Sequence, residues 1–152
     1  MRAADAARRI LPDPETQAEF FRSVNGKRFF AWIIDMVLIA VLSALALPFT
    51  LFLGLLVFPL MILVIGFFYR WFTLGAFSAT PGMVVAGIQL RKSDGLHLDG
   101  GTAFAHTLGY SISVAVPVLQ IISIVLMLTT ARKQGLTDHI LGTFPINRPA
   151  ML

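Results

Sequence analysis

Hydrophobic residues dominate two long blocks of the chain, and the first block predicts a helical hairpin. Residues 29–69 form a run of 41 positions with a single charge, Asp35. A membrane-spanning helix needs about 20 apolar residues, so this run is too long for one span and suits two. Pro48 lies near its middle, and proline ends or kinks the helix before it. We predict spans at about 29–47 and 50–70, joined by a turn without charge.

The second block allows two arrangements. Residues 100–131 hold 32 positions without a formal charge, with Pro117 near the centre. As one straight helix this block would measure about 48 Å, longer than a hydrocarbon core of about 30 Å. Either a tilted, kinked span over about 102–131 overshoots the membrane, or two half-helices part at Pro117 and return. Positively charged residues collect on the cytoplasmic side, so a basic tail favours the returning form. Half-helices, however, leave polar backbone at mid-membrane, which is tolerated only under protein cover.

Polar residues at the start of the chain predict a cytoplasmic segment over 1–28. Asp13-Pro14-Glu15 has the features of a helix start, and Asn25-Gly26 has those of a helix stop. We expect one short helix at the membrane surface, with Phe20 and Phe21 as anchors.

The region between the two blocks predicts a small β-hairpin outside the bilayer, at about 83–99. Thr80-Pro81-Gly82 is a turn signal, and the β-branched run 83–90 follows it. Asp94-Gly95 favours a hairpin turn, after which residues 96–98 form a return strand. Arg70, between two aromatic residues, is interpreted as an interfacial anchor.

Composition agrees with a membrane protein. The chain is 57% apolar and 13% charged, whereas soluble domains are about 45–50% apolar and about 25% charged. This excludes a soluble enzyme and a disordered chain and predicts an all-α integral membrane protein. The absence of cysteine excludes disulfides and thiolate chemistry. The net charge of +4 is interpreted as positive-inside bias, and without a basic stripe we expect no nucleic-acid partner.

The most informative charge is Asp35, because acidic residues within a span are candidate functional sites. Arg28 lies seven residues earlier on the same helix face, about 10.5 Å away along the axis. Asp35 is then either half of a structural ion pair or a site for a cation or proton. Asp138 is expected outside the hydrocarbon, where it caps a turn or pairs with Arg132. If the tail returns, Asp138 instead meets Arg28 and closes an Asp–Arg–Asp network.

No pattern indicates an enzyme, a cofactor or a metal centre. His139 stands beside Asp138, but two adjacent residues cannot make a four-ligand site. His97 and His106 have no partners at ligand spacing. No phosphate-binding loop and no nucleophile with a base is present.

Three motifs in order resemble the RDD family of small bacterial membrane proteins, which is named for one arginine and two aspartates. They cover residues 27–147 and comprise Lys27-Arg28 with Asp35, Thr80-Pro81-Gly82 with Gly87, and Leu136-Thr137-Asp138 with Gly142-Thr143. The resemblance departs at two positions. Met83 stands where the family has a basic residue, and Pro145 interrupts the closing apolar strand.

The resemblance implies a membrane domain over 29–147 and a tail over 148–152. It implies Arg28, Asp35 and Asp138 as the signature residues and a possible ion site. The expected location is the bacterial inner membrane, with several spans and a cytoplasmic N-terminus. We expect transport by cation/proton exchange, in a homo-oligomer or a larger complex because few spans surround a path poorly. The alternative is a non-catalytic accessory or assembly subunit of a larger membrane complex.

Overall fold

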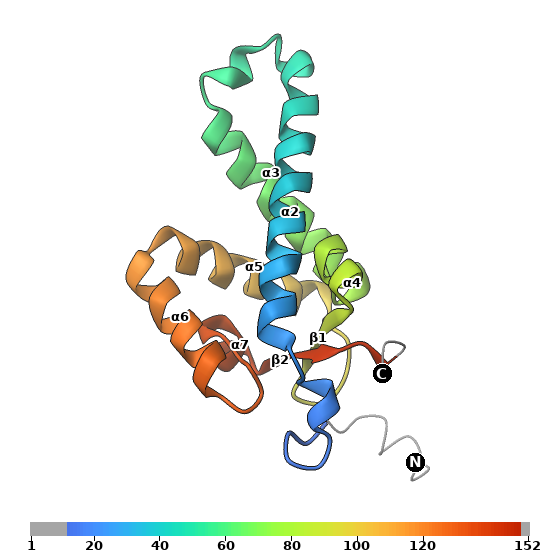
Figure 1. Cartoon of the computed structure of the whole chain (residues 1–152). Coiled ribbons are helices and arrows are strands. Elements are labelled where there is room, and N and C mark those ends of the chain that lie inside the picture. The colour runs from blue at the N-terminus through green and yellow to red at the C-terminus, as the bar shows by residue number, and fades with distance from the viewer. Residues whose placement is uncertain (1–11, 150–152) are drawn as a thin grey trace.

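The computed structural model describes residues 12–149, which form helices with one small sheet (Figure 1). In chain order the elements are η1 (Ala18–Phe20), α2 (Val24–Ala46), η2 (Leu47–Thr50), η3 (Leu53–Leu55), α3 (Phe58–Phe77), α4 (Pro81–Ala86), β1 (Ile88–Lys92), α5 (Gly100–Ala115), α6 (Pro117–Thr129), α7 (Leu136–Leu141) and β2 (Thr143–Asn147).

The predicted hairpin is present as α2 and α3, both long and apolar enough to cross a membrane. Helix α2 ends at Ala46, just before Pro48, as the sequence predicts. Helix α3 begins at Phe58 rather than near residue 50 because residues 47–57 form tight turns that include η2 and η3. The two helices extend beyond the rest of the molecule, and α5, α6 and α7 lie beside their lower half (Figure 1).

The predicted surface helix is largely wrong. Asp13 starts only a turn, and within residues 12–23 the sole helical element is the three-residue η1. Asn25-Gly26 does not stop a helix, because both residues belong to the first turn of α2. Phe21 is buried rather than placed as an anchor.

The strand predicted over 83–90 is wrong in its first half, which is the helix α4. Thr80 caps this helix by accepting a hydrogen bond from the Met83 N–H, and Pro81 occupies its first turn. Gly87, with φ of 75°, ends it in the left-handed conformation that favours glycine. A local helix signal therefore outweighs the β-branched composition of Val84-Val85.

The partner of β1 is the C-terminal strand β2, not residues 96–98. The two strands are antiparallel, with Leu90 opposite Pro145. The Leu90 N–H points away from β2 and donates to the Ser78 carbonyl at 2.7 Å. Proline lacks an N–H, so it fits opposite a residue whose own N–H points away from the partner strand. The Asp94-Gly95 turn does form, with the Gly95 N–H donating to the Lys92 carbonyl at 2.8 Å.

The second apolar block reverses direction. Helices α5 and α6 meet at Val116 with a bend of 115°. Val116 is extended because the following Pro117 disfavours helical backbone there. Strand β2 then lies beside the chain before α2, where the Asn147 side-chain amide donates to the Glu19 and Arg22 carbonyls. The C-terminal strand therefore returns to the N-terminal end of α2.

Gly82 lies where α4 touches α2, and we predict that Gly82→Ala destabilises the protein. A Cβ there meets the Ala31 carbonyl oxygen and approaches Asp35 Oδ1 to 2.7 Å. Overpacking of this kind costs about 1–3 kcal/mol. The control is Gly26→Ala in α2, where nothing lies within 4 Å of a new Cβ and alanine adds about 1 kcal/mol of helix propensity.

The thermal unfolding midpoint of each purified variant is measured in detergent. The expected result is a lower midpoint for Gly82→Ala and an equal or higher one for Gly26→Ala. Wild-type stability of Gly82→Ala contradicts the close packing of α4 on α2.

Candidate functional site

Asp138 is the centre of the first polar cluster. It is 1% exposed, and its Oδ2 accepts from Arg28 Nη1 at 2.8 Å and from the Gly135 N–H at 2.9 Å. Its Oδ1 accepts from the Thr143 hydroxyl at 2.8 Å and lies 2.9 Å from His106 Nε2. The carboxylate therefore joins α2, α5, α7 and β2, with two partners on each oxygen.

The surroundings of Asp138 favour its charged form. Burial raises the pKa of this carboxyl, but the Arg28 charge and the His106 contact outweigh burial and hold the pKa well below its usual range. Asp138 is thus ionised near neutral pH, as the anchor of an ion pair.

Asp35 is the centre of the second polar cluster. Its Oδ1 accepts from the Tyr69 hydroxyl at 2.7 Å and from the Gly82 N–H at 2.9 Å, and its Oδ2 accepts from the Thr80 hydroxyl at 2.5 Å. Arg70 Nη1 lies 3.9 Å from Oδ2. Asp35 therefore fastens α2 to α3 and to the start of α4, which gives Thr80-Pro81-Gly82 its structural role.

The signature residues divide between the two clusters. The contact between Arg28 and Asp138 predicted for a returning tail is present. Arg28 and Asp35 line the same cavity, but they do not pair with each other. Among residues 12–149, Arg28 pairs with Asp138, and Asp35 pairs with Arg70. Arg132 does not pair with Asp138, since its guanidinium lies 4.9 Å from the Phe144 ring centre.

Arg70 is not the interfacial anchor that its aromatic neighbours suggested. It is 8% exposed, and its guanidinium lies 4.2 Å from the centre of the Tyr110 ring. A signal was available, because Asp35 and Arg70 are the only formal charges between residues 29 and 90. Opposite charges isolated in apolar sequence are expected to pair.

His106 is the functional candidate that sequence reasoning missed. Its contact with Asp138 joins residues 32 positions apart, across the α5–α6 reversal. No local spacing indicates this contact, which depends on the reversal itself. His139 instead contacts the Gly135 carbonyl within α7.

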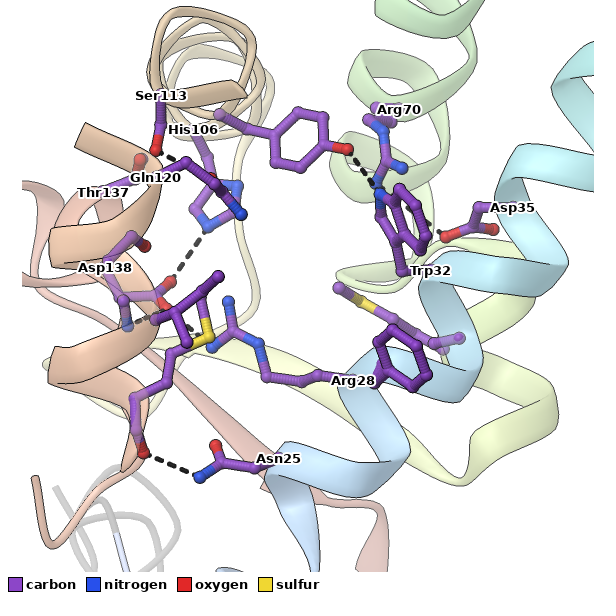
Figure 2. Close-up of a pocket in the computed structure, with 18 of the residues that line it drawn as sticks. Asn25, Arg28, Trp32, Asp35, Arg70, His106, Ser113, Gln120, Thr137 and Asp138 are labelled. Atoms are coloured by element: carbon purple, nitrogen blue, oxygen red, sulfur yellow. Dashed lines mark hydrogen bonds and ion pairs between the residues drawn. The ribbon is translucent and has the colours of Figure 1, made fainter. Parts of the chain in front are cut away.

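A cavity of about 420 Å³ lies between the two clusters. Figure 2 shows Asp35 and Arg70 on one side and His106 and Asp138 on the other, with Arg28 reaching toward Asp138. Its walls are mainly apolar and come from α2, α3, α5 and α6, with further residues from α4 and α7. Ser113 and Gln120, hydrogen-bonded at 3.0 Å, line it on either side of the helix break.

Gly142, a glycine of the third motif, shapes the backbone at the end of α7. Gly142 ends α7 with φ of 63° and places Thr143 for its bond to Asp138.

Within residues 12–149 no group of three metal-ligating side chains is placed to hold a metal ion.

Comparison with known proteins gives one match. The model of the RDD family matches residues 23–142, which include the residues that line the cavity and every member of the two clusters except Thr143. Comparison with curated proteins and with solved structures found no match.

Removing the charge of Asp138 is expected to destabilise the fold, because Arg28 then lacks its partner. Breaking a buried pair in this way costs about 3–5 kcal/mol. The prediction is a large fall in the unfolding midpoint and membrane abundance of Asp138→Asn. The control Asp94→Asn changes an exposed carboxylate in a turn, and its effect should stay within about 0.5 kcal/mol. Equal stability of the two variants would contradict the role of Asp138.

Proposed function

The chain belongs to the RDD family, and on that premise we propose that it is a multi-pass protein of the bacterial inner membrane that binds a small solute in its cavity and takes part in transport of that solute. The observation that carries this proposal is the cavity itself, bounded by two ion clusters and by the break between α5 and α6.

The distribution of charge supports a cytoplasmic N-terminus. The turn region between α2 and α3 carries no charge, whereas basic residues gather around the opposite end of these helices, in Lys27, Arg91, Lys92, Arg132 and Lys133. Basic residues are enriched in cytoplasmic loops. Because β2 lies beside the start of α2, the same argument supports a cytoplasmic position for the C-terminal strand.

The helix break supports binding of a solute. Irregular backbone is tolerated at membrane depth only where protein covers it or where it lines a cavity. Broken helices of this kind form the solute sites of several transporter folds. Here Ser113 and Gln120 place polar groups at the break and in the cavity wall.

Proton exchange is better assigned to His106 than to Asp35. Every oxygen of the two carboxylates already accepts a hydrogen bond, which disfavours Asp35 and Asp138 as direct cation ligands. His106 lines the cavity, and its Nδ1 has no partner among residues 12–149.

An accessory role is the second candidate. Large apolar side chains are exposed along the α2–α3 hairpin and on α5 and α6, and such surfaces fit a partner helix as well as lipid. Native mass spectrometry of the gently extracted protein separates the two functions. A homo-oligomer supports transport, and a stoichiometric foreign subunit supports the accessory role.

Membrane topology provides the first test. Because the chain returns at Val116, a reporter fused after Leu152 should lie in the cytoplasm, and one inserted after Thr50 should lie on the other side. Paired phosphatase and fluorescent-protein fusions measure this. A C-terminal reporter outside the cytoplasm would contradict the returning course in the membrane.

Proton flux provides the second test. Purified protein is reconstituted into liposomes that contain a pH dye, and a sodium or potassium gradient is imposed. Ile124→Trp fills the cavity, whereas Ile122→Trp changes a residue of similar exposure on the same helix outside it. We expect wild-type protein and Ile122→Trp to move protons and Ile124→Trp to lose most of this flux.

Two results count against the proposal. Wild-type flux equal to that of protein-free liposomes contradicts ion-coupled transport and leaves the accessory role. Equal flux in Ile124→Trp and Ile122→Trp contradicts the cavity as the path.

A further inference from the structure

We infer that the cavity binds a single-chain amphiphile with an acidic headgroup, a carboxylate or a phosphate. This inference rests on the proposed function, because it names the ligand class of the same cavity. It follows from the cavity's unpartnered polar atoms, the balance of its charges and the character of its rim.

Three buried side chains lack partners for a polar atom in the cavity wall. Arg70 Nη2, His106 Nδ1 and Thr107 Oγ1 have no hydrogen-bond partner among the described residues. Their side chains belong to residues that are 8%, 7% and 0% exposed, and all three line the cavity. Buried polar groups in native proteins are normally satisfied. These atoms are therefore suited to hold the headgroup of a ligand.

The charges of the wall favour an anion. Two arginines and two aspartates line the cavity, but they differ in whether their polar atoms are free to bind a ligand. Asp35 and Asp138 are covered by donors on both oxygens. Arg28 donates directly to Asp138, whereas Arg70 lies 3.9 Å from Asp35 and keeps a free N–H group. A carboxylate or phosphate accepts hydrogen bonds from Arg70 and from the Thr107 hydroxyl.

Figure 2 shows how the cavity separates a polar end from an apolar path. Arg70 and His106 lie on opposite sides of the cavity, with the Trp32 ring beside Arg70 and Asp35 and with Asn25 at the far end. Asn25 Oδ1 is the remaining unpartnered buried atom. It is an acceptor, so it does not bind the acidic group.

The rim indicates that the ligand has an apolar tail. Phe29, Trp32, Ile124 and Leu128 line the cavity and are also 63%, 41%, 45% and 63% exposed. They lie on α2 and α6, which belong to the segments that are candidates to enter the bilayer. A ligand therefore enters past apolar side chains. Such a path favours an acyl chain over a soluble inorganic anion. The volume of about 420 Å³ is within the range of small-molecule sites.

Binding of defined lipids to the full-length protein tests this inference. Native mass spectrometry and thermal shift in a neutral detergent compare palmitate, palmitoyl lysophosphatidic acid and hexadecanol. We expect one or both acids to bind and to raise the unfolding midpoint, and hexadecanol to do neither. Palmitate alone identifies a fatty acid, lysophosphatidic acid alone identifies a lysophospholipid, and both together support the shared acidic chemistry.

Variants locate the site. Thr107→Val keeps the shape of the side chain and removes the hydroxyl, so it should weaken acid binding by about tenfold while the protein stays folded. Arg70→Gln should weaken binding further, but it also alters the contact with Asp35, so the conclusion depends on Thr107→Val. Ile124→Trp should abolish binding, and Ile122→Trp should leave it unchanged.

Three results overturn the inference. These are equal binding of hexadecanol and the acids, no binding of either acid, and acid binding that persists in Ile124→Trp. Each is separable from failure of the proposed function. Proton flux without acid binding overturns the ligand class alone, and acid binding without flux overturns transport alone.

Discussion

The fold depends on satisfying two carboxylates that are removed from water. A buried charge is costly unless it is paired and hydrogen-bonded, and both Asp35 and Asp138 are 1% exposed. The donors that surround each of them come from distant parts of the chain. Satisfying Asp35 fastens α2 to α3 and α4, and satisfying Asp138 draws α5, α7 and β2 onto the start of α2.

The same arrangement creates the cavity. Because the carboxylates are held by opposite groups of helices, the space between them is bounded by charge on two sides and by apolar side chains elsewhere. Arg28, Asp35 and Asp138, the three residues that the family resemblance implied, thus fasten the walls of the cavity. The groups left free to act there are Arg70, His106 and Thr107, which lie outside the signature.

The sequence predicts the local features of this structure and, apart from the Arg28–Asp138 contact, misses the long-range ones. The uncharged run around Pro48 predicts the α2–α3 hairpin, and Pro117 predicts the break, because both depend on neighbouring residues. Residues 83–86 are helical because Thr80 supplies a cap and Gly82 must present its N–H to Asp35. The pairing of β1 with β2 and the contact of His106 with Asp138 require the α5–α6 reversal, for which sequence spacing holds no signal.

The most direct test is the combined stability and proton flux of Asp35→Asn. In the wild-type protein the Tyr69, Thr80 and Gly82 donors meet the Asp35 carboxylate. In the variant they meet a side-chain amide instead. If Asp35 is a structural clamp, the variant loses abundance and unfolds at a markedly lower temperature. A variant with wild-type stability that selectively loses flux would make Asp35 the ion site and contradict the account.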